Sequence, residues 1–306
     1  MPQTLTEARW RPLAQQHERL VSRWTQPRLE RRAAGRRHPI DDFLWEYYHH
    51  RPAQLRVWHP GLDVILCGSP PVAGHRHYTR VPDGWTAALA ADDPLWDRLA
   101  RNLAVLHATA GREIATRCFG MHEWAMVHGL AQEQIRHEQV PLRLPAADIV
   151  DVVADVGLRC THFDAYRFFT PSAAARQRPL TRSGQVDDEQ PGCVHTGMDL
   201  YRYAYEAAPF VGSDLVVACF RHARAARELD MAASPYDLSE WGLPAVPMET
   251  VAGRRDYALR QRDLALAAVP LRRRLIEQLG RTLAWAAQRG PDPAQSVRNP
   301  DAAGAR

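Results

Sequence analysis

The sequence predicts a mainly α-helical protein with a small β element, folded as a single compact helical domain. Apolar residues recur at helical spacing through most of the chain. Strand-like alternation with Pro-Gly and Asp-Gly turns is confined to about residues 55–85. No linker divides the 306 residues. One domain over residues 1–290 is therefore expected, followed by a disordered tail over 291–306.

Helical spacing begins in an Arg-rich N-terminal segment, residues 1–40, with Gly35 as its expected break. All 39 basic residues of the chain are arginines, and the formal net charge is +4. Arginine presents a planar fork that matches phosphate and carboxylate groups. This segment is expected to be a solvated helix face, with contact to a polyanion as the alternative.

Further along the chain, helical segments flank one long polar stretch. Between residues 93 and 140 the spacing is helical. Four leucines share the expected buried face: Leu95, Leu99, Leu103 and Leu106. Residues 171–192 mix Pro, Ser and Gly with polar residues, which predicts a long loop. The sequence "SPYD" at 234–237 has the form of a helix start, with Ser as N-cap and Pro next to it.

The composition is that of a soluble globular protein. No apolar run is long enough to cross a bilayer, and the first residues contain no apolar secretory segment. The five cysteines are odd in number and widely spaced, which argues against a disulfide framework. A cytoplasmic protein without membrane contact is expected.

A polar motif occurs twice. "CTHFDAYRFF" begins at Cys160 and "CVHTGMDLYRYAY" at Cys193, and both read Cys-x-His followed by Asp-x-Tyr-Arg. We expect the two copies to line one pocket from two neighbouring helices, with the predicted loop 171–192 over its mouth.

The Cys-x-His pairs raise the question of a metal. Cys160, His162, Cys193 and His195 form a chemically complete Cys2His2 set for zinc. One residue between Cys and His is tighter than the usual spacing of structural zinc sites, and buried thiols are common in protein cores. No cofactor is therefore expected, with a divalent metal, zinc or iron, as the alternative.

The carboxylates of the two motifs are the leading catalytic candidates. Asp164 and Asp199 each precede an arginine by three residues, Arg167 and Arg202. Two exposed local salt bridges are the simpler interpretation. Because both segments are rich in aromatic residues, however, we expect the two pairs to be at least partly buried. Buried charges are retained where they are paired or serve a function. The motif arginines, with Tyr166 and Tyr201, are the expected substrate-binding residues.

"MHEWAMVH" adds His122 and Glu123. Its histidines are six residues apart, so they do not share a helix face as the zincin motif requires. His122 and Glu123 could both point into a pocket as catalytic helpers; a polar stripe on an amphipathic helix is the alternative.

Carboxylates, aromatic rings and arginines together suit cleavage of a glycosidic bond. A carboxylate stabilises a developing oxocarbenium ion or activates water. Aromatic walls stack a base, and arginine holds a phosphate or a base edge.

Five blocks, in order, carry a resemblance: "FGMHEWAMVH", "RHEQVPLRL", "CTHFDAYRFFTP", "EQPGCVHTGMDLYRYAY" and "ELDMAASPYDL". The chain resembles, over nearly its whole length, an actinobacterial family that commonly carries the label 3-methyladenine DNA glycosylase. The second block contains His137 and Arg143, which we add to the substrate-binding candidates.

The resemblance implies hydrolysis of an N-glycosidic bond in damaged DNA, hence DNA repair. The resemblance further implies that Asp199 or Asp164 is the activating carboxylate, with Glu123 and His122 as helpers. Two other functions remain open from the residues. One is a metal-dependent enzyme acting on a small, polar, ring-bearing substrate through the Cys-x-His pairs. The other is a non-enzymatic nucleic-acid or ligand binder.

Overall fold

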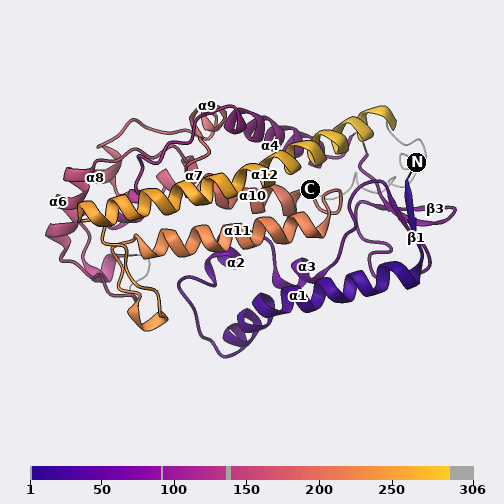
Figure 1. The fold of residues 1–306 in the computed structure, drawn as a ribbon, viewed down its shortest axis with the longest axis horizontal. Helices are drawn as coiled ribbons and strands as arrows, with labels where there is room; N and C mark the ends of the chain where they lie inside the picture. Colours follow the sequence, from indigo (N-terminus) through magenta and orange to yellow (C-terminus); the bar gives the residue numbers. More distant parts are fainter. Residues whose placement is uncertain (1, 91, 136–138, 290–306) are drawn as a thin grey trace, which may run out of the picture.

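A computed structural model of the chain describes residues 2–90, 92–135 and 139–289. The fold is mainly helical with one small sheet, as the sequence predicts (Figure 1). The predicted tail, residues 291–306, lies outside the described residues. Among the described helices, none has both the length and the apolar content needed to cross a membrane.

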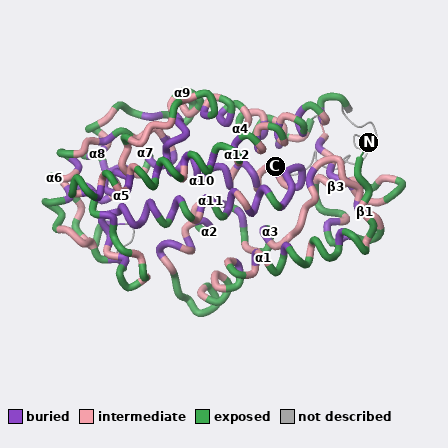
Figure 2. Tube along the Cα trace, viewed as in Figure 1, coloured by how far each residue is buried: buried purple, intermediate pink, exposed green. Residues whose placement is uncertain are grey.

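Four helices form the centre of the molecule. They are α4 (Leu95–Ala110), α10 (Val194–Glu206), α11 (Ser213–Ala232) and α12 (Val251–Arg289). α10 packs against α11, and α12 contacts the other three. α11 and α12 run side by side along the long axis of the molecule (Figure 1), and α11 is buried over most of its length (Figure 2).

The buried face of α4 is the predicted one. Leu95, Leu99 and Leu106 are buried, and Leu103 packs partly buried against the same core. Their spacing of three and four residues keeps them on one side of the helix. The prediction for this helix is confirmed.

The sheet lies at one end of the molecule (Figure 1) and has the strand order β1-β2-β4-β3. β2 (Val64–Leu66), β3 (Tyr78–Val81) and β4 (Gly84–Ala87) are antiparallel neighbours within the predicted β region. β1 (Gln3–Leu5) was not predicted; it pairs in parallel with β2. A three-residue strand has too short an alternation to be read from sequence alone.

The Arg-rich N-terminal segment forms α1 (Glu7–Ala33), which packs on α3 (Pro52–Arg56). Gly35 follows at a φ of +65°, in the left-handed region where helices commonly end. The expected helix and its break are confirmed.

Short helices complete the fold and occupy much of the end opposite the sheet. They are α2 (Phe43–Tyr47), α5 (Met121–Val127), η1 (Gln132–Gln134), α6 (Ala146–Val156), α7 (Phe163–Tyr166), α8 (Pro171–Ala174), α9 (Gln185–Asp188) and η2 (Ser239–Trp241). The stretch 171–192 is irregular apart from α8 and α9, so the loop prediction holds only in part.

The predicted helix start at 234–237 is wrong. The Ser234 hydroxyl donates to the Met231 carbonyl at 2.7 Å and so closes the end of α11. Tyr236 forms an antiparallel bridge with Leu142. This extended pairing satisfies backbone groups that a helix would otherwise use.

Candidate functional site

The two copies of the repeated motif meet at Arg202. Its guanidinium contacts Asp199 on its own helix, α10, at 2.5 Å and Asp164 of α7 at 3.2 Å. The pairs expected within each motif also form. Asp199 contacts Arg202, as above, and Asp164 lies 3.3 Å from Arg167. Arg182, from the intervening stretch, donates to Asp164 at 3.0 Å. The two motifs therefore lie together at this arginine. The expectation of one pocket beneath the stretch 171–192 is met only in part, because His195 is the residue of the second copy that lines the smaller cavity described below and the lining of that cavity includes none of 171–192.

Asp199 is fully enclosed by polar partners. Tyr48 donates its hydroxyl at 2.8 Å, and the Nε2 atom of His162 lies at 3.1 Å. Burial alone would raise the pKa of Asp199, but Arg202, His162 and Tyr48 outweigh it and lower the pKa below its ordinary value. Asp199 is an ionised anchor of the network and lines neither of the two cavities described below.

His162 joins Asp199 to a third carboxylate, Glu189. The Nδ1 atom of His162 caps α7 by accepting the Ala165 N–H at 3.3 Å. Nε2 must then carry the proton that faces Asp199, with Glu189 at 3.5 Å. Burial raises the pKa of Glu189, and one of its carboxyl oxygens has no hydrogen-bond partner in the part of the chain that the structure describes.

A second buried group contains His122 of α5, His195 of α10 and Asp230 of α11. His122 Nε2 lies 2.5 Å from Asp230, and the ring centroids of His122 and His195 are 4.2 Å apart. Burial, reinforced by His122, lowers the pKa of His195 well below its ordinary value. His195 is therefore a neutral imidazole at pH 7.

Arg227 holds the carboxylates beside this group. It donates to Glu123 and to Asp230, each at 2.7 Å, and its guanidinium lies 3.9 Å from the ring centroid of Phe43. The side chain is 1% exposed. A charge buried this deeply requires paired carboxylates, and the two contacts supply them.

A cavity of about 240 Å³ opens onto both networks. Aromatic rings, apolar side chains and charged residues of the networks line it together: Phe43, Tyr47, Glu123, Met126, Leu130, Gln134, Asp164, Ala165, Phe168, His195, Arg227 and Tyr236. Two predicted catalytic residues, Asp164 and Glu123, thus face one space.

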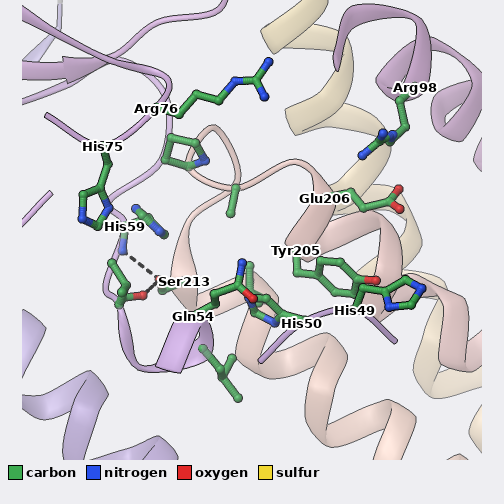
Figure 3. Close-up of a pocket in the computed structure, with 15 residues that line it drawn as sticks. His49, His50, Gln54, His59, His75, Arg76, Arg98, Tyr205, Glu206 and Ser213 are labelled. Carbon is green, nitrogen blue, oxygen red and sulfur yellow. Dashed lines mark hydrogen bonds between the residues drawn. The ribbon is translucent and has the colours of Figure 1, made fainter. Parts of the chain in front are cut away.

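A larger cavity of about 700 Å³ lies near the sheet. Figure 3 shows His59 and His75 on one side of it and His49, His50 and Tyr205 on the other. Burial lowers the pKa of His50 to about 3 and that of His59 to about 4, so both rings are neutral at pH 7.

Two charged residues that line this larger cavity have partners outside its lining. Arg76 contacts Asp93, and Glu206 accepts from Asn102. Neither of the two buried networks contributes a carboxylate to its lining. We therefore take the smaller cavity, with the networks behind it, as the candidate functional site.

Other predicted substrate-binding residues are placed away from that cavity's lining. Tyr201 is fully buried and its hydroxyl bonds His50 at 2.7 Å; Tyr166 packs on Phe169. Arg143 forms a two-armed pair with Glu249, with both contacts at 2.6 Å. His137 lies outside the described residues.

The Cys2His2 set considered as the alternative is not among the groups of potential metal ligands in the described residues. His162 and His195 each belong to a separate group with carboxylates. Cys160 donates to the His162 carbonyl at 3.4 Å, and Cys193 is buried at the N-cap of α10. Burial raises the pKa of both thiols, which keeps them protonated.

Sequence reasoning missed four members of the networks: Tyr48, Glu189, Arg227 and Asp230. One signal was available for two of them. Arg227 and Asp230 are three residues apart, the same spacing as Asp199 and Arg202.

Comparison with known proteins adds no relative. Scans of family models, curated proteins and solved structures found no match to this chain.

Proposed function

We propose that the chain is an N-glycosidase-type hydrolase acting on a nucleobase, most concretely a DNA glycosylase that releases an alkylated purine. The observation that supports this is the small cavity in which two arginine-paired carboxylates, Asp164 and Glu123, face aromatic rings. Ring walls and paired carboxylates are the groups that glycosidic cleavage of a stacked base requires.

The size of the cavity favours one ring system as the bound group. Pockets for drug-sized ligands are about 300–1,000 Å³. At about 240 Å³ this cavity is smaller. It suits a single base, with the sugar and phosphates remaining at the mouth. Phe43 and Tyr47, whose rings stack on each other at 5.0 Å, offer an aromatic wall.

Within this proposal Asp164 is the catalytic carboxylate. It lines the cavity and pairs with three guanidinium groups, those of Arg167, Arg182 and Arg202. An ionised carboxylate stabilises the positive charge that develops on the sugar as the bond to the base breaks. Asp199 does not line the cavity, so its role is to position Arg202.

The arginines around Asp164 supply phosphate contacts in this scheme. The side chains of Arg167 and Arg182 are 46% and 64% exposed, and both are anchored at one end by Asp164. A partly exposed guanidinium has further N–H donors for a phosphate oxygen.

The test is release of the free base from alkylated duplex DNA, followed by mass spectrometry. The wild type is expected to release 3-methyladenine, and Asp164→Asn to do so at least about 100-fold more slowly, the lower range for a positioned catalytic group. Asp188→Asn is the matched control. Like Asp164, Asp188 is an aspartate paired with an arginine, in this case Arg178, but it does not line the cavity.

The outcomes separate the activity from the residue. A wild type that releases no base refutes the glycosylase proposal. Release that is equally fast in Asp164→Asn and Asp188→Asn keeps the activity and removes Asp164 from the mechanism.

A further inference from the structure

Three helices bring two imidazoles and one carboxylate to a common point behind the small cavity. His122, His195 and Asp230 each offer one ligand atom, and these atoms all lie within 4.8 Å of one another. The residues are 6%, 5% and 0% exposed. Such a group could be a hydrogen-bonded cluster or a metal site, and the surroundings distinguish the two.

The donor set itself is one that catalytic metals use. Two histidines and one carboxylate bind zinc in metalloenzymes and bind non-haem iron(II), in both cases leaving coordination positions open. Metal–ligand bonds of about 2.0–2.2 Å place two ligand atoms at most about 4.4 Å apart. The three ligand atoms, all within 4.8 Å of one another, satisfy this limit to within a small movement, and His122 Nε2 and Asp230, now 2.5 Å apart, would separate to admit the ion.

One ring nitrogen of the group lacks a partner. His195 Nδ1 is inaccessible to solvent and makes no hydrogen bond within the described residues. A buried polar atom left unpaired destabilises the fold. An imidazole nitrogen without a hydrogen bond is free to act as a metal ligand.

The balance of charge also calls for a cation. Asp230 and Glu123 share the single guanidinium of Arg227, with all three side chains buried. Two carboxylates face one guanidinium, and a second positive charge must come from a proton shared between His122 and Asp230 or from a bound metal ion. A buried carboxylate of this kind is retained when it is paired or bound to a metal.

We propose that His122, His195 and Asp230 bind one divalent transition metal ion, with Zn²⁺ and Fe²⁺ as the ions that suit these donors. His195 also lines the small cavity together with Glu123 and Arg227. The open side of the ion therefore faces the space in which a substrate would bind.

The neighbouring group of His162, Glu189 and Asp199 meets the same distance criterion but differs chemically. His162 Nδ1 accepts a backbone N–H, so Nε2 carries the proton and has no lone pair for a metal. The carboxylates do not distinguish the two groups, because Asp199 and Asp230 each have polar partners already. The difference lies in the ring nitrogens. The metal proposal is therefore confined to the group containing Asp230.

The experiment uses the full, tag-free chain stripped with a chelator. Co²⁺ is titrated in while the visible spectrum is recorded, and elemental analysis is made of the protein as purified. We expect one Co²⁺ per chain, with ligand-field bands of a low-coordinate ion, and displacement by Zn²⁺. A thiolate charge-transfer band should be absent, because no cysteine belongs to the group.

Variants locate the ion. Asp230→Asn and His195→Gln should lower Co²⁺ affinity at least about 10-fold, whereas Asp230→Glu, which keeps the carboxylate, should retain the bands. His50→Gln is the matched control, since His50 is a similarly buried histidine (7% exposed) outside the group. Circular dichroism verifies that each variant is folded.

Three results would overturn the metal site. They are a folded wild type that binds no stoichiometric Co²⁺, a thiolate band in the spectrum, and unchanged affinity in folded His195→Gln. None of these measurements involves base release, so the metal site and the glycosylase activity succeed or fail separately.

Discussion

His195 and Asp199 lie one turn apart on α10 and belong to two different buried networks. His195 contacts the ring of His122, and Asp199 anchors Arg202. The i,i+4 spacing places both side chains on one face of the helix. A single helical turn therefore links the two networks, and changes at either residue should affect the cavity between them.

Residue-scale chemistry also predicts how stability depends on pH. His50 is buried and His59 is partly buried, and burial lowers their pKa values to about 3 and about 4, so both are neutral at pH 7. In the unfolded chain each binds a proton near pH 6.5. The unfolded state thus holds more protons between about pH 6.5 and 4, and the free energy of unfolding should fall as the pH decreases through that window.

Urea unfolding at pH 7 and pH 5 measures this loss. Each histidine contributes up to about 1.4 kcal/mol per pH unit. The double variant His50→Gln/His59→Gln should lose less stability than the wild type over the same interval. An equal loss in both proteins would show that these two histidines do not carry the effect.

At the scale of elements, the start of α10 is the most constrained part of the site. Gly192 immediately precedes Cys193, the N-cap of this helix, and its backbone carbonyl accepts from Gln261 of α12 at 2.6 Å. A Cβ atom added at Gly192 would lie 2.2 Å from the Ala115 carbonyl oxygen. The helix that carries His195 and Asp199 is therefore fixed by a backbone contact that only glycine permits.

We expect Gly192→Ala to destabilise the protein by about 2–3 kcal/mol, because backbone must move to relieve the contact. Gly280→Ala is the matched control. Gly280 lies inside α12 with nothing within 4 Å of an added Cβ, so alanine there should stabilise by about 0.5–1 kcal/mol. Thermal and urea unfolding measure both; similar effects at the two positions would contradict the contact argument.

At the scale of the whole molecule, the net charge is only +4. A charge this small attracts DNA weakly, so binding must depend on local arginine contacts. If the proposed DNA glycosylase binds duplex DNA, its affinity should fall linearly on a log–log plot against salt. Each phosphate contact contributes a slope of about −0.9.

The double variant Arg167→Gln/Arg182→Gln should therefore make the salt dependence less steep by about 1 to 2. Arg260→Gln serves as the control, since Arg260 is an exposed arginine paired with Asp256 on α12 and distant in sequence from the motifs. Fluorescence anisotropy with labelled DNA at several salt concentrations gives the slopes. Equal slopes in all three proteins would exclude Arg167 and Arg182 as phosphate contacts.

The sequence by itself determined the helical class, the buried face of α4 and the region of the sheet. These features depend on local periodicity and turn chemistry, which neighbouring residues carry. The repeated motif likewise indicated that Asp164 and Asp199 would share a location. Their local arginine pairs follow from a spacing of three residues.

Only the tertiary structure decided which distant groups complete the site. Glu189 reaches His162 from the stretch predicted as a loop, Tyr48 reaches Asp199 across 151 positions, and Asp230 meets His122 across 108. Sequence spacing has no bearing on contacts of that range. Buried polar atoms select their partners when the helices pack, because each must be satisfied once water is excluded.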